Sequence, residues 1–255
     1  MKYDFLKFGL PTAASLFLAA GAMAQVNNPE IEPNETKATA TVAASGGAGM
    51  VAGDTISGTT TGASATAGAT SLDTFRVKTA AAELGIYRYQ LALSSTTLFQ
   101  TGTIRGLTQT SSGIAASSDV AVQTSSATTN PARFNQWYGF GRQEEIYYRV
   151  TGTATSTGSY TSTLTRDRVD AVAIPGTSLP GLVTVQPDLT TANALDTDYW
   201  VYDSSFNAVP TFGHDNLDFP GVSRTLAAGT YYVAMAVVNL ANNQPAATDD
   251  TTRTG

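Results

Sequence analysis

Short apolar segments separated by turn-forming residues dominate the chain and limit the folds that it can adopt. These segments run for about five to eight residues between clusters of Gly, Ser, Thr, Asn and Asp, and no long stretch has helical periodicity. In Tyr87–Leu93, tyrosine and leucine alternate with Arg88, Gln90 and Ala92, which is the pattern of a strand with one buried face. The sequence therefore predicts an all-β protein, an antiparallel β-sandwich with a jelly-roll-like arrangement.

The predicted strands fall into two sets on either side of one turn-rich segment. That segment, residues 166–180, contains Pro175, Gly176 and Pro180 beside a short charged run, which is typical of a linker. We therefore predict a first sandwich over residues 25–165 and a second β unit over residues 181–255. The first set of strands comprises Asp54–Gly58, Thr74–Lys78, Ile86–Leu93, Thr103–Leu107, Val120–Thr124, Glu145–Gly152 and Ser159–Leu164, and the second comprises Gly181–Val185, Asp198–Asp203, Val222–Leu226 and Thr230–Val238.

A weak internal repeat favours two divergent copies in tandem, with one sandwich carrying a large insertion as the open alternative. Glu145–Val150 resembles Gly229–Ala234, and both segments contain paired tyrosines. Ile146–Val150 and Gly158–Thr161 are expected to pair as a hairpin. The polar end of the chain, Thr248–Gly255, supplies no closing strand, so a truncated second unit and a longer natural chain also stay open.

The first 24 residues contain the three parts of a secretory signal peptide. Lys2 and Lys7 make the start basic, residues 8–20 form an apolar run, and Ala22–Ala24 is a cleavage site. The run is too short to span a hydrocarbon core of about 30 Å. We therefore expect export, with Gln25 as the mature N-terminus and no membrane span after the signal is removed.

Composition argues against several classes of function. The formal net charge is −6 and no basic stripe is present, so nucleic acid is not expected as a partner. The chain has no cysteine, which excludes thiol catalysis, cysteine-ligated zinc and disulfides. A catalytic triad would have to use His214, the single histidine, and no G-x-S-x-G motif accompanies it. The sequence therefore predicts that the protein is not an enzyme.

An acidic segment follows the predicted cleavage site and points to a bound cation. Glu30–Glu35 holds three carboxylates and one amide, and an extended backbone would direct Glu30, Glu32 and Asn34 to one side. Pro33 favours such a backbone at the residue before it. Ca²⁺ takes six to eight oxygen ligands from groups of this kind. The alternative interpretation is a solvated acidic arm.

Several segments of the chain are similar to short motifs that occur together in one domain family. Glu32–Ala40 is similar to the opening motif E-P-N-[DE]-x-x-x-x-A. Gly53–Gly58 and Leu72–Val77 are similar to the G-x-I-x-G and D-x-[YF]-x-[FV] strands. The closing pattern, L-x-[LV]-Y-D followed by L-x-A-G-T-Y-Y-V, is similar to Asp198–Asp203 and Leu226–Val233. Together these segments resemble the bacterial pre-peptidase C-terminal (PPC) domain family, whose members are small secreted β-sandwiches. About 120 residues separate the opening from the closing strands, too many for one compact copy.

The resemblance extends to calcium-dependent collagen-binding modules of this broad group. These modules hold calcium with an E-x-E-x-N-[DE] segment and with aspartates before a D-Y-F strand. Carried over residue by residue, the resemblance implies five calcium ligands here, namely Glu30, Glu32, Asn34, Glu35 and Asp73. Thr70 stands where the family pattern has a further aspartate, so the implied site has one ligand fewer.

Three other groups of residues carry alternative interpretations. In the aromatic stretch 133–142, Trp137, Tyr138 and Phe140 are candidates for a ligand-binding surface or for the core. The adjacent pair Glu144 and Glu145 is expected on a solvated strand edge, with a glycosidase pair as the alternative. A second acidic group serves either turns or a second cation, and comprises Asp196, Asp198, Asp203, Asp215 and Asp218.

These features together predict a non-catalytic module that is secreted or held at the cell surface and stabilised by calcium. Its expected role is adhesion, binding of an extracellular polymer, matrix, polysaccharide or cell-surface component, or service as an accessory domain of an exported protein. Two alternatives stay open: a secreted hydrolase with a glycosidase-like carboxylate site, and a structural cell-surface component.

Overall fold

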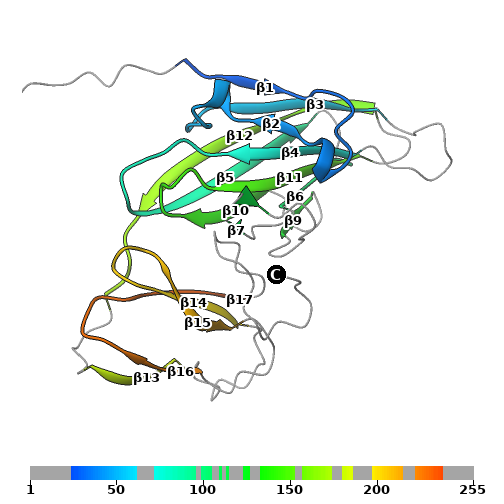
Figure 1. The fold of residues 1–255 in the computed structure, drawn as a ribbon. Coiled ribbons are helices and arrows are strands. Elements are labelled where there is room, and N and C mark those ends of the chain that lie inside the picture. Colours follow the sequence, from blue (N-terminus) through cyan, green and yellow to red (C-terminus); the bar gives the residue numbers. More distant parts are fainter. Residues whose placement is uncertain are drawn as a thin grey trace, which may run out of the picture.

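The computed structural model describes residues 24–61, 72–95, 99–104, 109–110, 113–114, 123–126, 133–152, 157–173, 180–185, 197–214 and 222–237. These residues form strands joined by turns and by two short 3₁₀ helices, η1 (Lys37–Thr39) and η2 (Ser45–Gly47), which confirms the all-β prediction. They make up an N-terminal unit, in the upper part of Figure 1, and a C-terminal unit, in the lower part. Within this part of the chain, no helix is long and apolar enough to cross a membrane.

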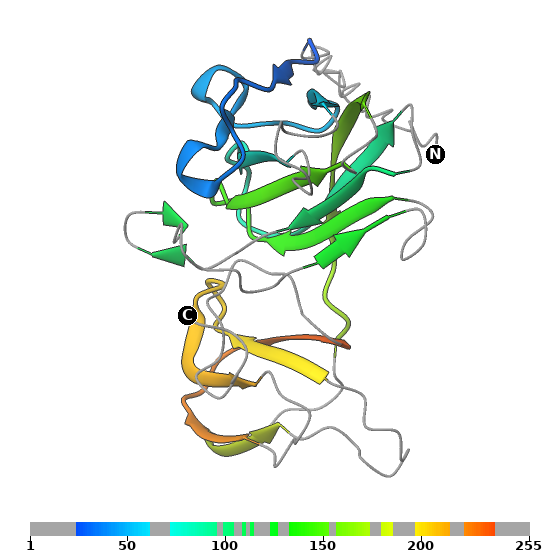
Figure 2. The same cartoon turned by 90° about the vertical axis from the view of Figure 1, so that its right-hand side faces the viewer.

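The N-terminal unit is a sandwich of two five-stranded sheets (Figures 1 and 2). The first sheet has the order β1-β3-β12-β5-β10, formed by Asn27–Pro29, Thr55–Thr61, Thr157–Val169, Ile86–Ser95 and Phe134–Gly139. The second has the order β2-β4-β11-β6-β9, formed by Thr41–Ala43, Leu72–Lys78, Glu145–Thr151, Thr101–Ile104 and Gln123–Ser125. The short edge strands β1 and β2 pair in parallel with β3 and β4, and the remaining pairs are antiparallel. A small separate hairpin joins β7 (Gln109–Thr110) and β8 (Gly113–Ile114).

An apolar core lies between the two sheets and explains the alternating patterns in the sequence. In β5, tyrosines and leucines are buried at every second position, whereas the residues between them are half-buried or exposed. Burial of a large apolar side chain contributes about 1.5–3 kcal/mol. The first sheet contributes Ile56, Tyr87, Tyr89, Leu91, Leu93, Trp137, Tyr160 and Leu164 to this core, and the second contributes Ala43, Phe75, Val77, Ile104, Ile146, Tyr148 and Val150.

The C-terminal unit has two smaller sheets in the described residues. Strands β15 (Ala208–His214), β14 (Thr197–Tyr202) and β17 (Tyr232–Val237) form one sheet in that order. Strands β13 (Gly181–Val185) and β16 (Val222–Leu226) form the other. A small core of Tyr199, Val201 and Phe212 packs against valines of β13 and β16. The expected strands 181–185 and 222–226 therefore have the predicted bounds.

Strand β12 extends the N-terminal unit beyond the predicted boundary at residue 165. Its pairing with β5 continues to Val169, so residues 166–169 belong to the sheet and not to the predicted linker. The charged run has ion-pair partners there, because Asp167 accepts from Arg88 at 2.9 Å and Arg168 donates to Glu83 at 3.0 Å. Such exposed pairs contribute at most about 1 kcal/mol. The run therefore marks the solvated surface of a strand.

The predicted hairpin of residues 146–150 with residues 158–161 is wrong. β11 pairs with β4 and β6 in one sheet, whereas β12 pairs with β3 and β5 in the other. Each strand already has neighbours on both sides, so the connection crosses from sheet to sheet. Residues 105–107 and 120–122 of two other predicted strands lie outside the described residues.

A buried aspartate ties the N-terminal arm to the sandwich. Asp54 is fully buried, and its carboxylate accepts from Val26 N at 2.9 Å, Ser45 Oγ at 2.6 Å and Val51 N at 2.9 Å. A buried carboxylate is tolerated when its oxygens are hydrogen-bonded in this way. The network joins the residue before β1, η2 and the turn before β3.

Asp54→Ala is expected to destabilise the protein by about 3 kcal/mol, because three donors lose a charged acceptor. Urea unfolding followed by circular dichroism measures the change. Asp167→Ala is the matched control, since it removes an exposed carboxylate whose ion pair contributes at most about 1 kcal/mol. If both variants lose the same small amount of stability, the Asp54 network contributes no more than a surface ion pair.

Candidate cation site

The acidic segment bridges the two sheets of the sandwich. Glu30 N donates to Ser57 O of β3 at 2.8 Å, and Asn34 O accepts from Thr74 N of β4 at 2.9 Å. Because β3 and β4 belong to different sheets, residues 30–34 cross the edge of the sandwich between them. This crossing brings the segment to Asp73, the residue before Thr74 in β4.

Three carboxylates meet at this crossing. One oxygen from each of Glu30, Glu32 and Asp73 lies within 4.8 Å of the other two. Glu30 is half-buried, Glu32 is exposed and Asp73 is 1% exposed, so the group reaches from the interior to the surface. Two distant parts of the sequence therefore supply one compact acidic group.

Two buried oxygens in this region have no hydrogen-bond partner among the described residues. They are Asp73 Oδ2 and Asn34 Oδ1. The amide nitrogen of Asn34, which is fully buried, donates to Thr41 Oγ1 at 3.3 Å, so the unpaired atom is the oxygen, the type of ligand that a hard cation needs. Leaving a buried polar atom unpaired costs about 1–3 kcal/mol. A cation coordinated by these oxygens would remove that cost.

The electrostatics of the group also favour a cation. Burial raises the pKa of Asp73 to about 7, and the charge of Glu30 adds to the increase. Burial likewise raises the pKa of Glu30, and the charge of Glu32 adds to it. Thr59 N donates to Glu30 Oε1 at 2.8 Å and Tyr160 OH donates to Glu30 Oε2 at 3.4 Å. The carboxylates are therefore held together although their charges repel one another.

The donor set fits a hard cation. The three carboxylates and the amide of Asn34 offer oxygen ligands only, which suits Ca²⁺ and not zinc. Ca²⁺ takes six to eight oxygens at about 2.3–2.6 Å, so water or carbonyl oxygens would complete its shell. Gly58 makes room for this arrangement, because a Cβ atom there would collide with Glu30 Oε2 and with the Tyr160 hydroxyl.

One of the expected calcium ligands lies outside the carboxylate group, and two hydrogen-bond partners of Glu30 were not predicted. Glu35 is exposed and lies outside the three-carboxylate group, because the chain turns after Asn34 into η1, which the side chain of Thr36 caps. Thr70 lies outside the described residues. Thr59 and Tyr160, which hold Glu30, come from distant strands and were missed. The one sequence signal for them is Gly58 in the G-x-I-x-G-like strand.

The burial of Trp137 and Phe140 favours the core interpretation of the aromatic stretch, with Trp137 in the core of the sandwich and Phe140 in a separate cluster with Trp200, Tyr202 and Phe206. Trp137 is fully buried and stacked on Tyr89 with a centroid distance of 5.2 Å, and Phe140 is 5% exposed. Residues 134–139 form β10, whose pairing with β5 turns every second side chain into the sandwich. Tyr138 is half-buried, and of the three candidates it alone keeps a partly exposed ring.

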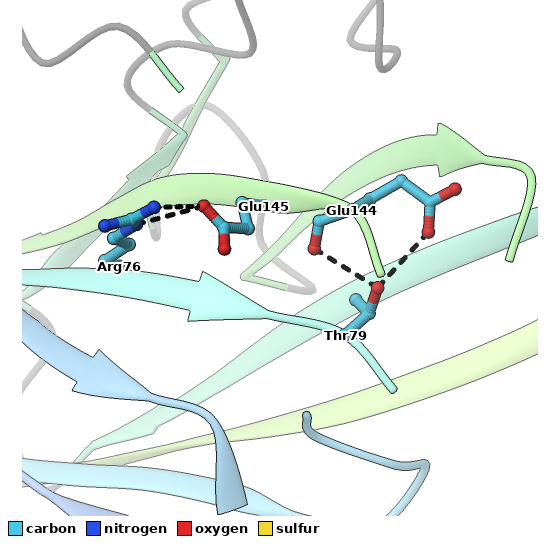
Figure 3. Close-up of polar contacts among 4 residues, drawn as sticks. All are labelled: Arg76, Thr79, Glu144 and Glu145. Carbon is cyan, nitrogen blue, oxygen red and sulfur yellow. Dashed lines mark hydrogen bonds and ion pairs between the residues drawn. The ribbon is translucent and has the colours of Figure 1, made fainter. Parts of the chain in front are cut away.

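The adjacent glutamates Glu144 and Glu145 serve separate contacts (Figure 3). Glu145 accepts from Arg76 Nε at 3.0 Å and from Arg76 Nη2 at 2.6 Å. Glu144 is 4% exposed, which corrects the expectation of a solvated position, and its Oε2 accepts from Thr79 Oγ1 at 3.2 Å. Figure 3 shows the two side chains directed towards different partners, so they do not converge on a common substrate position.

Asp203 is the one member of the second acidic group whose side chain the structure describes. Its Oδ1 accepts from Asn207 N at 2.9 Å and from Ser205 N at 2.8 Å, and these bonds lower its pKa. Asp203 therefore stabilises a turn, which is one of the two roles considered for this acidic group. Asp196, Asp215 and Asp218 lie outside the described residues, as does the side chain of Asp198.

No protein-family model matches the chain, and no curated protein matches it. The resemblance to PPC domains therefore rests on the sequence motifs alone.

Proposed function

We propose that the chain is a secreted, non-catalytic β-sandwich module of the PPC type that calcium stabilises. Its role is to bind an extracellular polymer or a cell-surface component, or to serve as an accessory domain of an exported protein. One observation carries the calcium proposal: the carboxylates of Glu30, Glu32 and Asp73 converge, and the Oδ2 atom of Asp73 is buried without a hydrogen-bond partner among the described residues.

The position of the site explains what calcium would do. The acidic segment and Asp73 belong to different parts of the chain, and the segment crosses the edge between the two sheets. A cation held between them fastens the N-terminal arm to β4 and turns a repulsive group into an attractive one. The proposed action is therefore structural, and no step of it requires turnover of a substrate.

Export and the tandem relation belong to the same proposal. The basic start, the apolar run and Ala22–Ala24 support export. N-terminal sequencing of exported protein should return Gln25. The C-terminal unit, with sheets of three and two described strands, is proposed as a shorter divergent copy of the N-terminal sandwich.

Calcium is expected to raise the melting temperature of the protein, and this experiment tests the proposed function. Extracellular modules bind calcium at about 10⁻⁴–10⁻³ M. A ligand at a hundredfold excess over its dissociation constant stabilises the folded state by about 2.7 kcal/mol. Thermal unfolding in chelator and in millimolar calcium measures the shift. Magnesium should produce a smaller one, because it prefers a smaller octahedral shell and keeps its waters.

Two single substitutions provide the matched comparison. Glu32→Ala should abolish the calcium shift, and because Glu32 is exposed the variant should fold normally. Glu35→Ala removes an equally exposed glutamate outside the carboxylate group and should leave the shift intact. A melting temperature that is the same in chelator and in calcium would remove calcium from the proposed function.

A further inference from the structure

Two turns meet where the C-terminal unit lies against the N-terminal sandwich. The first, residues 140–144, joins β10 to β11 in the sandwich. The second, residues 203–207, joins β14 to β15 in the C-terminal unit. Figures 1 and 2 show β14 on the side of its unit that lies nearer to the sandwich. We call these two turns the interunit contact.

A buried carboxylate organises the first turn. Oε1 of Glu144 accepts from Phe140 N and, at 3.0 Å, from Arg142 N. Its Oε2 accepts from Thr79 Oγ1 and Tyr89 OH, both at 3.2 Å. The turn is therefore fixed to the interior of the sandwich, and Phe140 and Arg142 are held in place for contacts with another part of the chain.

A second carboxylate organises the opposite turn. Asp203 accepts from Ser205 N and Asn207 N, and Phe206 N donates to Asp203 O at 2.9 Å. Phe206 has φ 56°, a conformation that is uncommon for a residue other than glycine and persists where surrounding contacts stabilise it. The turn thus presents the ring of Phe206 at its tip.

The two turns contact each other through aromatic rings and one guanidinium. Phe140 stacks on Phe206 with a centroid distance of 4.8 Å and an interplanar angle of 12°, and meets the edge of Tyr202 at 4.8 Å. Phe206 in turn packs on Tyr232 of β17 at 4.7 Å. Arg142 donates to Phe206 O at 3.3 Å and also to Ser205 O. Phe140 and Phe206 are 5% and 8% exposed.

This contact covers the second face of a thin sheet. One face of the β15-β14-β17 sheet packs on β13 and β16, and its other face carries Trp200 and Tyr202, which pack with Phe140. Small sheets have little stability of their own, and an apolar sheet face has to be buried against another element. We propose that the interunit contact is a latch, through which the N-terminal sandwich keeps the C-terminal unit folded and in a fixed orientation.

Hydrogen–deuterium exchange of the full-length chain tests the latch. In the wild type, amides of β14 and β11 should lose protection together as urea is raised, because the units unfold as one body. Phe206→Ala removes the central ring and should speed exchange in β14 on the order of a hundredfold without urea, while β11 keeps its protection. Phe99→Ala is the matched control, since that ring is 65% exposed and lies elsewhere.

A second variant tests the latch without changing a residue in the hydrophobic core of either unit. Arg142→Ala removes an exposed side chain that is not part of either hydrophobic core, so a general failure to fold is not expected. It should speed exchange in β14 about tenfold, whereas Arg168→Ala, which removes another surface arginine, should not. Unchanged protection of β14 in both Phe206→Ala and Arg142→Ala, or equal loss of protection in β11, would overturn the latch.

Discussion

Trp137→Ala is expected to destabilise the N-terminal sandwich by about 3–5 kcal/mol, the range for removing a large aromatic side chain from a core. The indole is fully buried and stacked on Tyr89 with an interplanar angle of 13°. The two rings lie directly opposite one another in the pairing of β10 with β5. The truncation therefore leaves a cavity between two central side chains, which the surrounding strands cannot fill without distortion.

Urea unfolding followed by far-ultraviolet circular dichroism measures this loss. Tyr138→Ala is the matched control, because the next residue in β10 points to the opposite face and is half-buried. Its cost should be about 1 kcal/mol, typical of substitutions outside the core. A Trp137→Ala variant with wild-type stability and weakened binding to an insoluble polymer would instead support the ligand-binding interpretation of this residue.

The buried face of β10 could not be predicted from the sequence pattern. Strand β5 was predictable because its tyrosines and leucines alternate with polar or small residues. In Phe134–Gly139, aromatic and polar residues occur on both faces, and flanking glycines and arginines suggest a loop. Only the pairing of Trp137 with Tyr89, which is 48 positions away in the chain, decides which side is core.

The parallel edge strands were not predictable for a different reason. β1 and β2 are three residues long, and neither has an apolar alternation that marks a strand. They exist because distant groups fix them: Asp54 holds the N-terminal arm, and Thr41 Oγ1 accepts from Ile31 N at 2.9 Å. Such long-range polar contacts leave no periodic signal in the sequence.

The candidate site was predictable in part. Alternation in the acidic segment and a family-like motif at Asp73 placed Glu30, Glu32 and Asp73 in one group, as the structure also does. The motif could not show that the chain turns into η1 at Glu35, because that turn depends on capping by Thr36. It also could not show that Tyr160 reaches Glu30, since β12 and β3 pair across about 100 positions.

Asp73→Asn is expected to stabilise the calcium-free protein and to abolish its response to calcium. The substitution preserves the shape of the side chain and removes its negative charge. Asp73 is 1% exposed and lies beside Glu30 and Glu32. Desolvation and repulsion therefore decrease in the absence of a cation. With calcium present, one anionic ligand is missing, so the stabilisation of about 2.7 kcal/mol expected at a hundredfold excess is lost.

In the presence of chelator, the difference in stability between the wild type and Asp73→Asn should depend on pH. The pKa of Asp73 is about 7 in the folded protein and near its ordinary value of 3.8 in the unfolded chain, so the folded state binds this proton more tightly. The contribution of Asp73 to stability is therefore fully present below about pH 4 and is lost as the pH rises through about 7. The advantage of Asp73→Asn over the wild type should grow across this range.

Thermal unfolding of both proteins, in chelator and in millimolar calcium at about pH 5 and pH 8, tests these expectations together. In chelator at the higher pH, Asp73→Asn should melt above the wild type, and added calcium should reverse the order. Glu83→Gln removes a carboxylate that is 79% exposed and should behave as the wild type in every condition. An Asp73→Asn variant that melts below the wild type in chelator at pH 8 would show that the carboxylates are stabilised by a group other than a metal. A calcium shift that survives in Asp73→Asn would place the cation away from β4.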